Sequence, residues 1–511
     1  MTTKLTTIKI MTKILFTGLA LLFVQLSFAA PKIENWTTDS GLRVYYVNVP
    51  ELPMLDLRLT FAAGSAYDGE KMGISGMTTS MLSKGAAGLN ADQIAEAFET
   101  VGAEFSTGTG LDSAWINLRS LTFEEQLEPA LQNWLKVIQK PNFPEADFAR
   151  LKKQALVGLE AEKQDPGSIA SKAFYANLYA GHPYSQPQNG NEKTIDALTI
   201  DELKAFFKQY YVNKNAQLAL VGSISKEQAK KIALQVSNAL LDGDRGVGEK
   251  AADIPPVKPL TEAKVVHIPF PSSQAHVMIG QPGNKRGDKD YFSLYLGNHG
   301  LGGSGFTSRL MKEIRVKRGL SYSVYSYFIP MKENGPFMLG LQTKLSQTDE
   351  AIKVARDVLN TFQKDGPSEE DLAASKLNIT GGFPLRTASN SDIIGYIDMI
   401  GFYGLPLDYL DTFTKTINAI TRDQVVDAFK RRLDTDKLLT IIVGGEAKDE
   451  ESSASKDTAE KAPELTKAPL LLAANEATAK AGNETATDEA AEDDASEDET
   501  AEDEDEEPDC D

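Results

Sequence analysis

The chain has 511 residues, which is too many for one core of typical size. With 41% hydrophobic and 25% charged residues, its composition is that of an ordinary globular protein. Its one cysteine, Cys510, excludes a disulfide framework and a cysteine-ligated metal site within one chain. No two of its four histidines lie at the i, i+4 spacing with which a helix holds zinc; they are His182, His267, His276 and His299. The net charge of −20 is concentrated in residues 481–511, which carry 17 acidic side chains and leave residues 30–480 at −6. Such a body has no broad cationic surface, which excludes nucleic acid as a partner.

The first 29 residues have the pattern of a signal peptide. Three lysines precede the apolar run ILFTGLALLFVQLSF, and Ser27 and Ala29 place small residues at positions −3 and −1 of a cut after Ala29. The run is shorter than the roughly 20 residues of a spanning helix, which favours cleavage over an uncleaved membrane anchor. We therefore expect an exported, periplasmic protein with no stable membrane insertion.

An internal repeat divides the rest of the chain. Residues 195–222 match residues 417–444 without a gap, at an offset of 222. Each copy begins with a threonine suited to cap a helix, Thr199 or Thr421, and ends in an apolar strand before a glycine. Matching apolar positions across a helix and a strand predict two duplicated domains.

Composition sets the domain boundaries. We expect a first domain at 31–245, a linker at 246–258 within the Gly-, Pro- and charge-rich segment 243–260, and a second domain at 259–446. Alternating strand-like runs and long helical stretches, such as 91–101 and 350–363, predict an α+β fold of two tandem homologous α/β sandwich domains; the runs are LRVYYVNV, LDLRLTFAA, AWINLRSL, AHVMIG and FMLGLQTKL. Residues 447–511, rich in acids and poor in aromatics, are predicted to be a disordered tail.

Residues 34–445 resemble the pitrilysin or insulinase family of zinc peptidases, which includes the mitochondrial processing peptidases. The resemblance rests on the opening TTDSGLRVYYVNVPELPMLDLRLTFAAGSAYDG and on GISGMTTSMLSKG, residues 73–85, where active members carry a Gly-x-x-His-x-x-Glu-His helix. Here the three functional positions of that motif are Gly76, Thr79 and Ser80. Glycine offers no ligand atom and hydroxyls bind zinc weakly, so this resemblance implies a degenerate, metal-free site. The family's downstream glutamate ligand corresponds to Glu160 or Glu162, each of which is equally explained as a solvated helix charge.

The second half resembles the family segment that faces the zinc from across the substrate cavity. In LGNHGLGGSGFTSRLMKEIRVKRGLSYSVYSYF the matching pair is Arg315 and Tyr322. The resemblance implies that a tyrosine phenol donates to the oxyanion formed in peptide hydrolysis while an arginine holds substrate carbonyl groups. The alternative is structural, with Arg315 in a salt bridge and Tyr322 a buried aromatic.

A glycine-rich loop precedes this pair. GLGGSG, residues 300–305, matches the dinucleotide pattern Gly-x-Gly-x-x-Gly, but YSVYSYFIP supplies no acidic residue about 20 positions on. We instead expect Gly302, Gly303 and Gly305 to shape a substrate cavity or to let helix and strand approach closely. His299, beside the loop, is predicted to be a polar loop residue rather than a catalytic base.

These patterns predict the non-zinc subunit of a heterodimeric metallopeptidase that is inactive alone and cleaves unfolded exported peptides. It would bind no cofactor itself, and the zinc would belong to a partner, an HxxEH-bearing homologue. One alternative is a catalytically inactive homodimer that binds peptides or scaffolds an envelope complex. Another is an independent peptidase with a relocated metal site.

Overall fold

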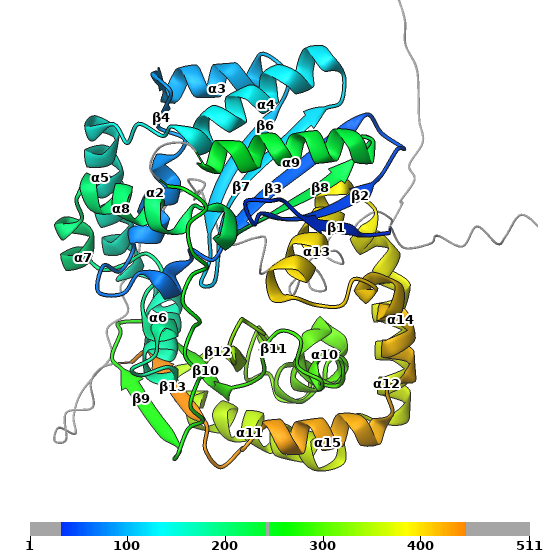
Figure 1. The fold of residues 1–511 in the computed structure, drawn as a ribbon. Coiled ribbons are helices and arrows are strands. Elements are labelled where there is room, and N and C mark those ends of the chain that lie inside the picture. Colours follow the sequence, from blue (N-terminus) through cyan, green and yellow to red (C-terminus); the bar gives the residue numbers. More distant parts are fainter. Residues whose placement is uncertain (1–31, 242–244, 446–511) are drawn as a thin grey trace, which may run out of the picture.

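The computed structural model describes residues 32–241 and 245–445, so the predicted signal peptide at 1–29 and tail at 447–511 lie outside the described residues. Two sheets organise this part of the chain (Figure 1). The first has the order β1 (Glu34–Thr37), β2 (Arg43–Asn48), β8 (Ala216–Gly222), β3 (Met54–Phe61), β7 (Ala114–Leu121), β6 (Glu104–Thr109). The second has the order β9 (Lys264–Ile268), β13 (Leu439–Val443), β10 (Gln274–Pro282), β12 (Pro336–Lys344), β11 (Val324–Phe328).

Helices of each half surround these sheets, and a two-stranded hairpin, β4 (Gly85–Ala86) with β5 (Leu89–Asn90), lies in the first. The helices of the first half are α2 (Ile74–Met81), α3 (Ala91–Glu99), α4 (Glu124–Gln139), α5 (Glu145–Glu162), α6 (Pro166–Leu178), α7 (Glu192–Ala197), α8 (Ile200–Tyr210) and α9 (Lys226–Leu241). Those of the second half are α10 (Tyr291–Asn298), α11 (Thr348–Asp365), α12 (Glu369–Gly382), α13 (Asn390–Tyr403), α14 (Tyr409–Ala419) and α15 (Arg422–Arg432). In the described part of the chain, no helix combines the length and apolar character needed to cross a bilayer.

The duplication predicted from the sequence extends through the fold. Shifting α8 by 222 residues gives the bounds of α15. Strand β10 pairs with β13 as β3 pairs with β8, at an offset of 220, since Asp56 lies opposite Val221 and His276 opposite Val443. Strands β2, β8, β3, β7 and β6 correspond in order to β9, β13, β10, β12 and β11, and in each sheet the first pair of these is parallel. The prediction of two tandem homologous α/β sandwich domains is confirmed.

The repeated helices begin where their threonines predict. The Thr199 hydroxyl accepts from the Glu202 backbone N–H, and the Glu202 carboxylate accepts from the Thr199 N–H at 2.9 Å. Thr421 and Gln424 form the same reciprocal capping box on α15. Such caps satisfy backbone donors that the first helical turn leaves open.

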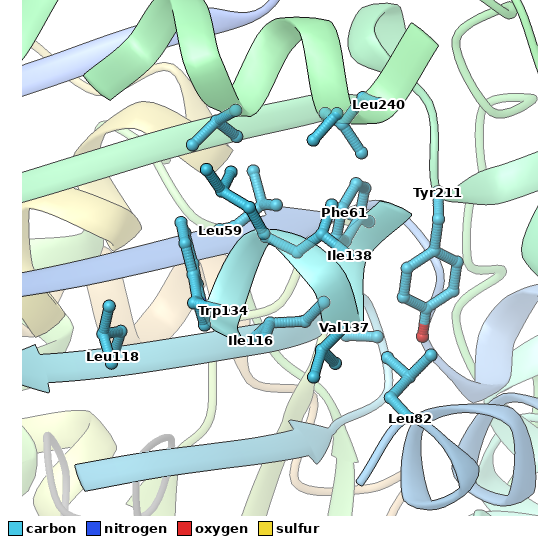
Figure 2. Packing of buried hydrophobic residues seen from close by; sticks show 14 of the residues in the cluster. Leu59, Phe61, Leu82, Ile116, Leu118, Trp134, Val137, Ile138, Tyr211 and Leu240 are labelled. Carbon is cyan, nitrogen blue, oxygen red and sulfur yellow. The ribbon is translucent and has the colours of Figure 1, made fainter. Parts of the chain in front are cut away.

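The first core lies between one face of the first sheet and its own helices. Strand β3 alternates, so Leu55, Leu57, Leu59 and Phe61 are buried on that face. Figure 2 shows α4 presenting Trp134, which is fully buried, to this face. Burial of each such side chain contributes about 1.5–3 kcal/mol.

The opposite face of each sheet is covered by a helix from the other half of the chain. Helix α6 packs on β10 and β13, and α13 packs on β2, β3 and β8 (Figure 1). Phe174 of α6 is fully buried against Gly280, where an added Cβ would lie 2.8 Å from the ring. Gly401 of α13 gives the same close approach to Tyr45 of β2. The two halves thus exchange helices and share their cores.

Polar contacts fix α13 on the first sheet. Arg58 Nε lies 2.9 Å from Asp398 Oδ2, with both side chains nearly buried, and Gln217 Nε2 donates to Asp398 Oδ1 at 2.6 Å. The Arg43 guanidinium donates to the Gly401 carbonyl at 3.0 Å. Because Asp56, Arg58 and Thr60 alternate with the leucines of β3, its polar face meets the exchanged helix.

A buried carboxylate joins the halves at a second point. Asp112, in the β6–β7 loop, accepts from the Tyr184 hydroxyl at 2.7 Å, from the Lys332 backbone N–H at 2.8 Å and from the Tyr403 hydroxyl at 3.0 Å. Burial raises the pKa of Asp112, although these donors oppose the shift. Removing one partner would leave a buried polar group unsatisfied.

The segment predicted as a linker is packed against the domains. The Val247 carbonyl accepts from the Lys214 N–H at 3.1 Å, and the Ala251 N–H donates to Asn215 Oδ1 at 2.9 Å. Ile254 is buried, and the Pro255 carbonyl lies 2.7 Å from His182 Nε2. Its composition predicted a connection without regular structure, but not this docking.

Replacing Phe174 with alanine tests the exchange of helices. We expect a loss of about 3–5 kcal/mol, because the substitution leaves a cavity between α6 and the second sheet. Hydrogen exchange should accelerate in β10 and β13, over 100 residues away in sequence, as well as in α6. Phe123→Ala, at a ring that is 50% exposed, is the matched control and should change stability by less than about 0.5 kcal/mol. Faster exchange confined to the first half would contradict the shared core.

Candidate functional site

Helix α2 carries the positions of the degenerate zinc motif. It starts after Gly73, whose φ of 92° is readily adopted by glycine. The buried Asp68 carboxylate accepts from the Gly73 N–H at 2.6 Å and from the Ser75 N–H at 3.1 Å. Burial raises the pKa of Asp68 to about 7, outweighing these donors.

The three motif positions have different surroundings. Gly76 is half-buried, and a Cβ placed there would meet nothing within 4 Å. Thr79 is 2% exposed; its hydroxyl donates to the Ser75 carbonyl at 2.8 Å and forms hydrogen bonds with the Tyr211 hydroxyl at 2.7 Å and the Thr109 hydroxyl at 2.8 Å. Ser80 is exposed. Glycine and two hydroxyls do not fit zinc, and the Thr79 hydroxyl is already fully engaged.

The two glutamates of α5 are held by lysines. Glu160 pairs with Lys163 at 2.8 Å, and Glu162 pairs with Lys172 and accepts from Asn189 Nδ2 at 2.9 Å. Within residues 32–241 and 245–445, no three His, Cys, Asp or Glu side chains gather closely enough to hold a metal ion.

Arg315 and Tyr322 lie together at the surface of the second domain. The guanidinium carbon of Arg315 is 4.5 Å from the centre of the Tyr322 ring and 4.6 Å from that of Phe306. The Tyr322 side chain is 80% exposed, so the buried-aromatic alternative is wrong. Stacking between two rings restricts the guanidinium while its N–H edge stays available to a ligand.

The glycine-rich loop forms a π-helical turn, His299–Gly303, followed by a short turn at Gly305–Thr307. A Cβ on Gly302 would lie 2.4 Å from the Ser326 hydroxyl of β11, so this glycine lets helix and strand approach closely. Gly303 lines the cavity described next, and Gly305 has a φ of 55°. Their predicted role in substrate binding stays a prediction.

A cavity of about 1010 Å³ lies between the two domains. It is lined by the polar faces of β3, β6 and β7, by α10 and the π-helical turn, by β11, and by α13. Arg315 and Tyr322 are not among its lining residues. The structure therefore separates the stacked pair from the cavity that Gly303 helps to line.

His299 lies on the wall of this cavity, and its prediction as a loop residue is wrong. It is buried in the π-helical turn, with Nδ1 2.9 Å from the Ser375 hydroxyl and Nε2 3.0 Å from Asn378 Oδ1. Burial lowers its pKa, so the neutral ring joins the turn to α12 with both nitrogens engaged. Such a histidine is not free to act as a base.

Comparison with known proteins identifies the family. The model for insulinase, peptidase family M16, matches residues 43–191, and that for the peptidase M16 inactive domain matches residues 197–379. A crystal structure of a peptidase M16 inactive domain from Pseudomonas fluorescens is 41% identical, with a TM-score of 0.78, and the match covers 81% of this chain and 98% of that one. The chain belongs to peptidase family M16. The resemblance seen in the sequence is confirmed.

Other M16 relatives differ in how they are described. A non-peptidase homolog, YmxG, from Helicobacter pylori is 26% identical over 443 residues, covering 86% of this chain and all of that protein. An uncharacterized zinc protease, YmxG, from Bacillus subtilis is 24% identical over 360 residues, or 70% of this chain and 85% of that protein. A protease from Helicobacter pylori, 18% identical with a TM-score of 0.71, shares the fold over 81% of this chain and all of that one. With Gly76, Thr79 and Ser80 in place of the family's zinc-binding helix, this chain is an inactive M16 homologue.

Thr79 provides a test of the present role of α2. Thr79→Val keeps the shape but leaves the Tyr211 and Thr109 hydroxyls without their shared partner, so we expect a loss of about 1–3 kcal/mol in urea unfolding. Ser80→Ala, one residue away and exposed, should change stability by less than about 0.5 kcal/mol. Equal changes in stability in the two variants would contradict a structural role for the Thr79 hydroxyl.

Asp68 should make stability depend on pH. Its pKa is about 7 in the folded chain against 3.8 in a free side chain, so the folded chain holds an extra proton between these values. The free energy of unfolding should therefore fall as pH rises from about 4 to about 7, by on the order of 1 kcal/mol per pH unit. Asp68→Asn should remove this part of the dependence in unfolding measured across that range. A wild-type advantage over Asp68→Asn that grows with pH would instead mean that the backbone donors hold Asp68 ionised.

Proposed function

We propose that this chain is the non-zinc subunit of a heterodimeric M16 metallopeptidase that cleaves unfolded peptides after export to the periplasm. Its partner would be an M16 homologue with the HxxEH motif, which supplies the zinc and the general base. This chain would supply Arg315 and Tyr322. The proposal also takes residues 1–29 as a cleaved signal peptide.

The observation that carries the proposal is the exposure of a stacked Arg–Tyr pair on a chain whose own motif helix does not fit zinc. A phenol that is 80% exposed can reach groups outside its own chain. Arg315, held between Phe306 and Tyr322, offers a forked donor suited to carbonyl or carboxylate oxygens. Donors that are already positioned stabilise developing negative charge without reorganising. The pair thus has the chemistry for the oxyanion of a reaction centred on another subunit.

A peptide-binding protein without catalytic function is the second candidate. It is favoured by the cavity between the domains, which belongs entirely to this chain. In that case the protein would bind unfolded peptides without cleaving them, whether or not a zinc-bearing homologue is present.

Reconstitution tests the first proposal. The mature chain alone should show no chelator-sensitive cleavage of a fluorogenic peptide. A mixture of the chain with the HxxEH homologue from the same cell should show such cleavage. Arg315→Ala and Tyr322→Phe should lower kcat by about 100-fold to 1000-fold, as loss of an oxyanion donor does elsewhere.

Assembly must be measured on the same samples. Size-exclusion chromatography should show an unchanged heterodimer for both variants, and Lys317→Ala, an exposed neighbour of Arg315, should keep full activity. Wild-type kcat in both variants would remove the pair from catalysis. Cleavage by the solitary chain that is abolished by chelator would overturn the division between subunits.

A further inference from the structure

The cavity between the domains has two chemically different walls. On the first-domain side, charged residues of β3 and β7 neutralise one another or pair with α13. Arg119 Nε lies 2.9 Å from Asp56 Oδ1, and Arg58 pairs with Asp398. Each of these two arginines is already paired with an aspartate of the same chain, so neither offers an unpaired positive charge to a ligand.

The wall formed by α6, α10, β11 and α13 is rich in tyrosine. Seven of the 16 tyrosines of the chain line this one cavity, and all seven are half-buried: Tyr175, Tyr291, Tyr295, Tyr325, Tyr327, Tyr396 and Tyr403. Tyr291 and Tyr295 stack at 6.0 Å on α10, and the rings of Tyr325 and Tyr327 lie 5.3 Å apart on β11. Tyrosines give broad, rigid contact with a polar tip and lose little side-chain entropy on binding. Such a wall suits an aromatic or aliphatic side chain of a ligand.

Arg286 adds a cation to this wall. It lies in the loop before α10, where its backbone N–H donates to the Met331 carbonyl at 2.8 Å. Its guanidinium carbon is 5.6 Å from the centre of the Tyr403 ring and 6.0 Å from that of Tyr291. Its Nε is buried without a hydrogen-bond partner, its guanidinium is hydrogen-bonded to the Tyr291 side chain, and among the described residues no carboxylate forms an ion pair with it. A guanidinium removed from water in this way gains most from an anionic partner.

We propose that this cavity binds an extended peptide, with an apolar side chain against the tyrosine wall and a carboxylate on Arg286. Its volume is at the upper end of the roughly 300–1000 Å³ range of ligand pockets. A carboxylate matches the fork of Arg286, and the neutral, fully hydrogen-bonded His299 adds no competing charge. The inference rests on the peptide-binding candidate and adds which groups the peptide must carry; it needs neither the zinc partner nor Arg315.

Three fluorescein-labelled peptides test it by anisotropy with the mature chain alone. The first is Gly-Ser-Gly-Phe-Glu-Gly-Ser-Gly amide, the second has Gln in place of Glu, and the third is the Gln peptide with a free carboxyl terminus. The Glu peptide should bind about tenfold more tightly than the Gln amide, as a charge-assisted hydrogen bond provides. Recovery of tight binding by the third peptide would mean that a terminal carboxylate serves equally well.

Arg286→Met should abolish the tenfold preference for the Glu peptide even though Arg386 also lines the cavity, and Arg286→Lys should keep part of that preference. The matched control is Arg150→Met, which removes an arginine of α5 that is half exposed and does not line the cavity, and the preference should persist. To allow for a folding defect in Arg286→Met, the wild-type chain is also cross-linked with the Glu peptide carrying benzoylphenylalanine in place of Phe. Cross-links should map to α10 and β11.

Equal binding of the Glu peptide and the Gln amide by the wild-type chain would overturn the proposal, as would cross-links that map away from the cavity. Because no zinc-bearing homologue is present, these results are independent of the reconstitution. Failed reconstitution together with peptide binding in the cavity would support the peptide-binding candidate. Successful reconstitution without peptide binding in the cavity would support only the proposed role of Arg315 and Tyr322.

Discussion

The reciprocal exchange of α6 and α13 is the constraint on which the rest of this structure depends. Each sheet has one face covered by helices of its own half and the other face covered by a helix of the other half. That helix is α13 for the first sheet and α6 for the second. Neither sheet can bury both faces until the two halves are together, so the halves act as one folding unit with two cores in common. The exchange also sets the distance between the cavity walls, because α13 packs on the first sheet while its own residues line the cavity. Asp112 adds a polar tie where the β6–β7 loop meets Lys332 and Tyr403.

The two domains share a fold, but the helical segments that follow β3 and β10 have different roles. The motif positions Gly76, Thr79 and Ser80 lie on α2, which follows β3 in the first domain, and α10 with its π-helical turn follows β10 in the second. Both segments serve packing: Thr79 connects α2 to Tyr211, while Gly302 allows the turn to approach Ser326. π-Helical turns often accompany functional sites, and here the turn brings His299 and Gly303 to the cavity wall. Helix α2 thus has a structural role in the first domain, while the π-helical turn after α10 lines a cavity.

Much of the fold could be predicted from local patterns in the sequence. Alternation on β3 marked the buried leucines, and the threonine caps marked the starts of α8 and α15, because both signals arise from neighbouring residues. The absence of zinc ligands at Gly76, Thr79 and Ser80 could likewise be read directly. The exchange of helices could not, since amphipathic periodicity shows that a helix has an apolar face but not which sheet will cover it. Arg286 and the tyrosine wall were missed for the same reason: Tyr175, Arg286 and Tyr403 come from distant segments and share no spacing. His299 was misjudged because its burial depends on Ser375 and Asn378 of α12.

The chain presents two half-buried arginines on aromatic rings in different surroundings. Arg286 is held at 5.6 Å and 6.0 Å from two tyrosine rings inside a cavity, where low dielectric makes a carboxylate partner valuable. Arg315 is stacked more closely, at 4.5 Å and 4.6 Å, yet lies beside a tyrosine that is 80% exposed, where water competes for every donor. A hydrogen-bond donor at such a surface stabilises little charge until another molecule excludes the water around it. The two arginines therefore have different requirements: Arg286 lies in a cavity formed by this chain alone, whereas the exposed Arg315–Tyr322 pair would hold a negative charge strongly only if a second protein surface excluded the water around it.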